Sequence, residues 1–212
     1  MRIKSFVFNP FGENTFVVWD ENSLDAAIID PGCYNTFELE TLVKFIEEKQ
    51  LHVLHILNTH MHIDHSAGNY ILEEKYGVKT ACNTADNYLS TNLTQQAIMF
   101  GFPYSGCNFK ISNNVVDGQH MTIAGQECIV LQIPGHTKGH VAYYFPNEKV
   151  VFSGDAIFRM SIGRTDFPGG NYQELIESIE EKLLTLPRDT DVLPGHGEST
   201  TVEFEQTNNP YL

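Results

Sequence analysis

The sequence is short of basic residues. Its 212 residues include 13 lysines and arginines against 27 aspartates and glutamates, which gives a formal net charge of −14. Binding to nucleic acid needs clustered cations that neutralise phosphates, and an anionic membrane surface attracts basic segments rather than acidic ones. The composition therefore argues against both kinds of partner, whereas a bound divalent cation would offset part of the negative charge.

Cysteines are also few, and the four that are present form no C-x-x-C pair (Cys33, Cys82, Cys107 and Cys128). This excludes the common zinc-finger and thioredoxin-type motifs. No apolar run approaches the roughly 18 residues of a membrane helix. The apolar stretch near Met1 is too short for a signal peptide and ends at Asn9 and Pro10. We expect four reduced, mostly buried thiols in a cytoplasmic protein.

Hydrophobic residues make up 42% of the chain, enough for a sizeable core, and no repeat or low-complexity linker interrupts it. The pattern predicts two similar halves, each made of short strands followed by a helix. We expect these halves to form two sheets packed face to face with helices outside. The predicted fold is an α+β, four-layer α/β/β/α sandwich in a single domain over residues 1–212. The expected strands are 3–8, 14–19, 26–30, 51–57, 115–116, 120–124, 128–133, 140–145, 149–152 and 191–193.

Four helices are predicted from apolar residues at helical spacing and from their end signals. One begins after Asn35, where Glu38 completes a capping-box-like pattern. The others are expected at about 66–75, 172–186 and 200–206. Residues 83–106 show the least clear secondary-structure pattern in the chain, and we expect them to form helix and loop that cover one face.

The most informative segment runs from Thr59 to His65 and reads T-H-M-H-I-D-H. Three histidines and an aspartate in six residues are hard to explain by packing, because buried polar side chains need partners. In an extended stretch, His60 and His62 point to the same side and can bind one cation together. Asp64 and His65 lie at the turn into a helix and can reach a second cation. These ligands suit zinc, iron or manganese, and the lack of a thiolate argues against a closed structural zinc site.

Three more candidate ligands each follow a glycine at the end of an expected strand, namely His136, Asp155 and His196. A glycine there lets the backbone turn tightly beside a metal. With the first segment they supply five histidines and two aspartates, enough for two metals and an open position for water. Of the remaining histidines, His140 is expected to pack behind the ligands, and the other three are expected to be structural (His52, His55 and His120).

These motifs, in this order, resemble those of the metallo-β-lactamase-fold superfamily, and most of all glyoxalase II (hydroxyacylglutathione hydrolase) of the shorter bacterial type. The matching segments are Ile28 to Gly32, Thr59 to His65, Gly135 to Thr137, Gly154 with Asp155, and Gly195 to Gly197. The resemblance independently implies the α/β/β/α sandwich. It also implies two divalent metal ions, with zinc as the first expectation and iron or manganese as alternatives.

The resemblance assigns each ligand a place. His60, His62 and His136 would bind one metal, and Asp64, His65 and His196 would bind the other. Asp155 would bridge the two metals. Asp30 and Thr137 would lie behind the ligands and orient them by hydrogen bonds. For Asp30, a purely structural role at a strand end before a Pro-Gly turn is an equal alternative.

The activity that the resemblance implies is hydrolysis of a small-molecule acyl thioester such as an S-acylglutathione. A hydroxide shared by two cations would attack the carbonyl, with Asp64 orienting the water or accepting its proton. Arg164 is expected to bind a substrate carboxylate, with a local ion pair to Asp166 as the alternative. Asp166 stands where the family has a tyrosine, and the C-terminal helical extension of full-length glyoxalase II has no counterpart, so glutathione is left open as the thiol.

Other activities remain open at this stage. The segment around Arg164 also resembles persulfide dioxygenases of the same superfamily, which bind a single iron through the equivalents of His60, His136 and Asp155. A lactone or other ester hydrolase would use the same hydroxide. A secreted β-lactamase, an RNA-processing nuclease and a non-enzymatic binding module are weaker alternatives. The sequence predicts no oligomeric state.

Overall fold

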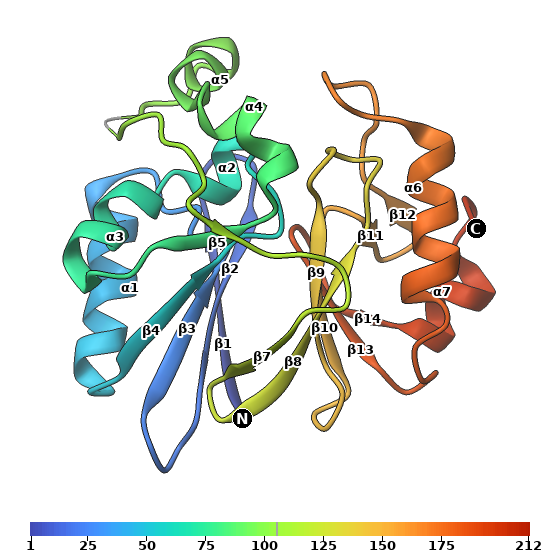
Figure 1. The fold of residues 1–212 in the computed structure, drawn as a ribbon, viewed down its shortest axis with the longest axis horizontal. Coiled ribbons are helices and arrows are strands. Elements are labelled where there is room, and N and C mark those ends of the chain that lie inside the picture. The colour runs from blue at the N-terminus through green and yellow to red at the C-terminus, as the bar shows by residue number, and fades with distance from the viewer. Residues whose placement is uncertain (105) are drawn as a thin grey trace.

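The computed structural model describes residues 1–104 and 106–212, and it places two six-stranded sheets face to face (Figure 1). The first sheet has the strand order β1-β2-β3-β4-β5-β6, and the second has the order β14-β13-β10-β9-β8-β7. The first comprises β1 (Arg2–Phe8), β2 (Glu13–Trp19), β3 (Asp25–Ile29), β4 (His52–Leu57), β5 (Thr80–Cys82) and β6 (Asn113–Asn114). The second comprises β7 (His120–Ile123), β8 (Gln126–Gln132), β9 (Val141–Phe145), β10 (Val150–Gly154), β13 (Asp191–Pro194) and β14 (Thr200–Thr201).

Helices cover the outer face of each sheet (Figure 1). On the first sheet these are α1 (Thr36–Glu48) and α3 (Asn69–Tyr76). On the second they are α6 (Tyr172–Ser178), which continues as the π-helical turn η2 (Ile179–Leu183), and α7 (Val202–Asn208). The shorter elements are α2 (Ile63–Ser66), η1 (Thr84–Asp86), α4 (Asn87–Ser90), α5 (Leu93–Phe100) and a small hairpin of β11 (Ile157–Phe158) and β12 (Ser161–Ile162). This arrangement confirms the predicted four-layer sandwich.

Alternation along β2 shows how the sequence builds these layers. Successive side chains of a strand point to opposite faces. Phe16 and Val18 therefore pack in the core between the sheets, where the Phe16 ring lies 5.0 Å from that of Phe152 on β10. Val17 points the other way and packs in the layer beneath α1, together with Leu42. One strand thus supplies two apolar layers, and the site lies where strands of both sheets end.

Some boundaries differ from those predicted. The helix expected over 66–75 begins only at Asn69, as α3, and the preceding turn, α2, was not predicted. The two are separated where the backbone at Gly68 lies against Pro31 and donates a hydrogen bond to its carbonyl (2.8 Å). A Cβ at Gly68 would collide with the Cys33 sulfur. The helix expected over 172–186 leaves the α-helical form after Ser178. The expected strand at 115–116 forms instead at 113–114, and β5 and the β11–β12 hairpin were not predicted.

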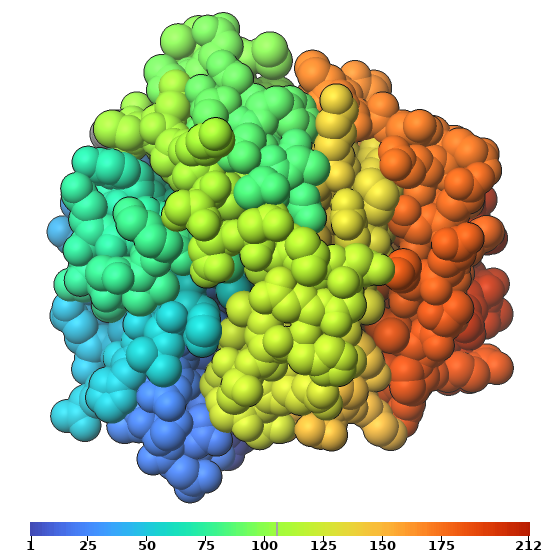
Figure 2. Space-filling model, viewed as in Figure 1, coloured from blue at the N-terminus to red at the C-terminus, as the bar shows by residue number. Residues whose placement is uncertain are grey.

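The segment that was hardest to interpret contains η1, α4 and α5. In Figure 2 the green residues of this segment form the top of the face in view. All four cysteines are free, and only Cys107 is exposed. Within the described ranges, no helix is both long enough and apolar enough to cross a bilayer.

Candidate metal centre

All seven predicted ligands converge at one edge of the sandwich. His60 and His62 follow β4, and Asp64 and His65 lie in α2. The second half contributes the other three, one each from the β8–β9 loop and from the segments after β10 and β13 (His136, Asp155 and His196). Residues up to 136 positions apart are therefore brought together by the packing of the two sheets.

One group of nitrogen atoms forms a tight triangle. His62 Nδ1 lies 3.0 Å from His60 Nε2 and 3.0 Å from His136 Nε2. The second group joins Asp64, His65 and His196, with 3.2 Å between the two Nε2 atoms and 3.4 Å from His196 Nε2 to Asp64 Oδ2. Each group could hold one metal ion.

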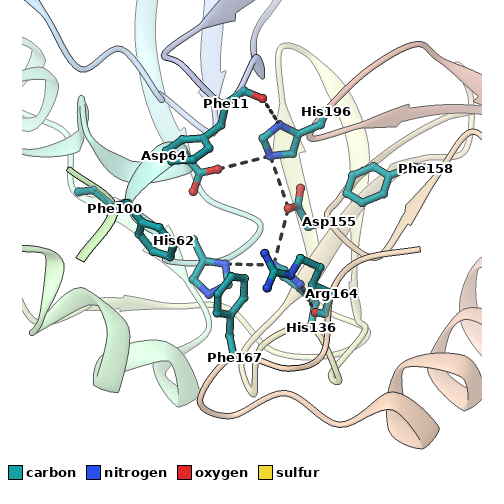
Figure 3. A pocket seen from close by; sticks show the side chains of 11 residues that line it. Phe11, His62, Asp64, Phe100, His136, Asp155, Phe158, Arg164, Phe167 and His196 are labelled. Carbon is teal, nitrogen blue, oxygen red and sulfur yellow. Dashed lines mark hydrogen bonds and ion pairs between the residues drawn. The ribbon is translucent and has the colours of Figure 1, made fainter. Parts of the chain in front are cut away.

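Asp155 lies between the two groups (Figure 3). Its Oδ1 is 3.3 Å from His65 Nε2, and its Oδ2 is 3.6 Å from His136 Nε2 and 3.5 Å from His196 Nε2. Oδ1 is buried and accepts no hydrogen bond from any described residue. A buried carboxylate oxygen without a donor is costly, and a cation beside it would satisfy it.

The hydrogen bonds behind the rings assign the proton positions. His136 Nδ1 donates to the Arg164 carbonyl (2.7 Å), and His196 Nδ1 donates to the Phe11 carbonyl (3.1 Å). The Thr59 hydroxyl donates to Asp30, so it accepts from His60 Nδ1 (3.0 Å). A neutral ring that donates from Nδ1 has its lone pair on Nε2, so His60 and His136 direct lone pairs toward His62 Nδ1, and His196 presents one after it loses a proton. Such an arrangement fits a cation.

The charge states favour the same interpretation. Burial lowers the pKa of His62 to about 3, and burial with the neighbouring imidazoles lowers the pKa of His60, so both rings are neutral and ready to bind a metal. Burial alone would also lower the pKa of His196, but Asp155 and Asp64 outweigh it and raise that pKa to about 9. A cation at the second group must therefore displace a proton from His196.

Asp30 supports both groups. Its Oδ1 accepts the Thr59 N–H (2.7 Å), and its Oδ2 accepts the Thr59 hydroxyl (2.7 Å) and faces His65 Nδ1 (3.3 Å). It thereby orients His65 directly and His60 through the hydroxyl. Of the two alternatives for Asp30, the geometry favours the orienting one.

Asp86 is a supporting residue that sequence reasoning missed. Its carboxylate accepts from the Met61 N–H (3.2 Å), the Thr137 hydroxyl (2.8 Å) and the Gly139 N–H (2.7 Å). It therefore joins the loop of His60 and His62 to the loop of His136, and Thr137 acts through Asp86 rather than on a ligand. No local pattern signals this role, since the partners are 25 to 53 residues away.

Three further residues sit close behind the centre. His140 lies there as expected, and its Nε2 accepts the Asp155 N–H (3.0 Å). Glu13, also missed, is fully buried and accepts from the Thr15 hydroxyl (2.9 Å). Gly195 leaves room for the Asp155 carboxylate, because a Cβ there would collide with Asp155 Oδ1. That contact explains why glycine precedes His196.

A cavity of about 300 Å³ opens in front of the centre and includes Arg164 in its wall. The Arg164 guanidinium forms two hydrogen bonds with Asp166, from Nε (2.9 Å) and Nη2 (2.7 Å). The local ion pair that was the alternative for Arg164 is therefore present. A role for Arg164 in substrate binding stays a prediction.

Comparison with known proteins identifies the family. The profile of the metallo-beta-lactamase superfamily matches residues 8–196, a range that contains all seven candidate ligands. The chain belongs to the metallo-beta-lactamase superfamily. Within that superfamily, it is 38% identical to the hydroxyacylglutathione hydrolase GloC of Haemophilus influenzae, with 100% of this chain and 98% of that protein covered.

Two solved structures of superfamily members are similar over the whole chain. The BLEG-1 B3 metallo-beta-lactamase superposes with a TM-score of 0.90 at 32% identity and covers 100% of this chain and 99% of its own. TTHA1623, solved in a di-iron-bound form, gives a TM-score of 0.87 at 34% identity and covers 99% of this chain and 100% of its own.

Proposed function

We propose that this protein is a binuclear metal-dependent hydrolase that cleaves small-molecule acyl thioesters, such as an S-acylglutathione. The observation that carries the proposal is the pair of ligand groups on either side of one carboxylate, Asp155, with both groups bordering an open cavity. The name of the GloC relative supports thioester hydrolysis. Two bound divalent cations would lower the pKa of a shared water toward neutrality and polarise the substrate carbonyl.

Asp64 is our candidate for handling the proton of the attacking water. Burial would raise the pKa of its carboxyl, but His65 and His196 outweigh burial and hold the pKa below its usual value. Asp64 is therefore ionised at neutral pH, and it borders the cavity beside His196. An ionised carboxylate at this place can orient a water and accept a hydrogen bond from it. A thiolate is a good leaving group, so the proposed reaction needs no dedicated acid.

Metal content measured together with turnover tests the proposal. We expect two metal ions per chain, hydrolysis of an S-acylglutathione, loss of activity on chelation and its return with added metal. Asp155→Asn should lose both metal and activity, whereas Asp117→Asn, on the surface and paired with Lys182, should lose neither. One iron per chain with oxygen uptake on a glutathione persulfide would instead favour the dioxygenase.

The identity of the metal and the class of acyl substrate also belong to the proposal. Zinc is our first expectation, and the di-iron form of TTHA1623 supports including iron, with manganese as a third candidate. A lactone and a β-lactam belong in the same assay, because the same centre could open either ring. We also expect one cytoplasmic domain over residues 1–212, with its four free thiols kept reduced.

A further inference from the structure

The cavity in front of the centre has aromatic walls. Four phenylalanines from four separate segments line it: Phe11 after β1, Phe100 at the end of α5, Phe158 in β11 and Phe167 after β12. In Figure 3, Phe100 and Phe167 lie on one side of the polar centre and Phe158 on the other. The cavity is therefore lined both by polar groups of the candidate centre and by aromatic rings.

Three of the rings form a continuous edge-to-face series that reaches a ligand. The ring centroids of Phe11 and Phe100 are 5.9 Å apart, and those of Phe100 and Phe167 are 5.8 Å apart. Phe167 then contacts the ring of His62 at 5.5 Å, while Phe158 lies 6.0 Å from His196 on the other side. Apolar contact surface therefore extends from the mouth of the cavity to both ligand groups.

The rim rings are incompletely covered. Phe11 is 44% exposed and Phe100 is 38% exposed. Exposed apolar rings grouped around a cavity are typical of a site that an apolar ligand covers. An aromatic or short aliphatic group placed between them would bury area on both sides.

Among lysines and arginines, only Arg164 lines the described walls of the cavity. Its guanidinium is paired with Asp166 and lies over the Phe167 ring, 4.3 Å from the centroid. The arginine therefore already has an acidic partner and packs on an aromatic face. A substrate carboxylate would have to compete with Asp166 for the one arginine on these walls, in a chain with a net charge of −14.

We propose that the site prefers thioesters in which an apolar, ring-sized group flanks the scissile carbonyl over thioesters whose flanking groups are charged or hydroxylated. This inference rests on the proposed thioester hydrolysis and names the substrate class for it. The apolar group can belong to the acyl part or to the thiol part, and the two series below distinguish these sources.

Two substrate series test the preference in the metal-loaded protein. The first varies the acyl group on N-acetylcysteamine, using acetyl, lactoyl and phenylacetyl. The second varies the thiol on an acetyl group, using N-acetylcysteamine, benzyl mercaptan and glutathione. Each kcat/KM is divided by the rate of hydrolysis by hydroxide alone, which removes differences in intrinsic reactivity. We expect the ring-bearing member of at least one series to exceed the lactoyl or glutathione member by about tenfold or more.

Variants connect the preference to the rings. Phe167→Ala and Phe100→Ala should each reduce the kcat/KM of the ring-bearing substrate, relative to that of the acetyl thioester of N-acetylcysteamine, by about fivefold. Phe37→Ala is the matched control, because Phe37 is 78% exposed on α1 and lies outside the cavity wall. Its ratio should equal that of the unmodified protein.

Calorimetry provides a readout that needs no turnover. Unreactive ketone analogues, with CH₂ in place of sulfur, should bind about fivefold more tightly when they carry the ring than when they carry a methyl group. Failure to hydrolyse any thioester would refute the proposed function. The apolar preference of the cavity would then be tested by calorimetry alone, through the binding of the ring-bearing analogue relative to the methyl analogue. Hydrolysis of all thioesters with equal ratios, unaltered in Phe167→Ala, would overturn the apolar preference and leave the hydrolase intact. A preference for the lactoyl or glutathione member would also overturn it.

Discussion

Replacing Asp30 by asparagine tests how much the hydrogen bonds that orient the candidate ligands contribute to metal binding. The substitution preserves shape and removes one negative charge. Asp30 accepts three hydrogen bonds, two from Thr59 and one from His65. An asparagine has only one acceptor oxygen, so either orientation turns its NH₂ group toward a donor. In one orientation that donor is the Thr59 N–H, and in the other it is His65 Nδ1.

The size of the effect follows from these contacts. A hydrogen bond to a charged group contributes about 1.5–3 kcal/mol, and opposing two buried donors adds to the loss. Substitutions behind metal ligands typically reduce metal affinity by about 10–100-fold, which corresponds to about 1.4–2.7 kcal/mol. The two estimates agree. We expect the Asp64–His65–His196 group to lose more affinity, since Asp30 faces His65 directly and reaches His60 only through the Thr59 hydroxyl.

Stepwise competition with a chromophoric chelator measures the two metal affinities separately. Asp25→Asn is the matched control, because Asp25 begins β3, the strand that Asp30 directly follows, and its side chain is 40% exposed. Far-ultraviolet circular dichroism confirms that the variants are folded. If Asp30→Asn is folded and both affinities stay within about twofold of the unmodified protein, Asp30 has only a structural role and the reasoning is wrong.

Four other variants test separate contacts. Gly195→Ala should lower metal content while circular dichroism stays native, because the new Cβ displaces Asp155; full metal content would contradict this. His62→Ala should lose metal and activity without unfolding, and global unfolding by circular dichroism would refute it. Burial raises the pKa of Asp86 from 3.8 to about 6, so ionisation costs the folded state free energy. In urea unfolding without metal, the unmodified protein should therefore lose about 3 kcal/mol relative to Asp86→Asn as pH rises from below 4 to above 6. Arg164→Ala should raise KM more than it lowers kcat if the arginine contacts substrate, and an unchanged KM removes it from the site.

The candidate ligands could be predicted from sequence because each lies in a short, dense motif. His60, His62, Asp64 and His65 are nearly contiguous, and the other three each follow a glycine. The four-layer sandwich could also be predicted from the sequence, because strand alternation and helical spacing are local periodicities. The structure confirms the sandwich and brings the seven side chains together.

The supporting contacts could not be predicted, because their partners are remote in sequence. Asp86 stands in an unremarkable segment and acts through residues on two other loops. The break at Gly68 depends on Pro31 and Cys33, which the local helical pattern does not include. For Arg164, the sequence allowed either binding of a substrate carboxylate or an ion pair with Asp166. Only the side-chain geometry shows the ion pair.

The position of the centre couples metal binding to the packing of the two halves. The His60–His62–His136 group and the Asp64–His65–His196 group each take ligands from both halves, so neither group is complete until the sheets pack. Without cations, that packing also buries several carboxylates together: burial raises the pKa of Glu13 well above its usual value, and Asp30 and Asp64 raise it further. A ligand that binds only the folded state stabilises it by about 2.7 kcal/mol at a hundred times its dissociation constant. Two cations at this edge would therefore stabilise the contact between the sheets while they serve the chemistry.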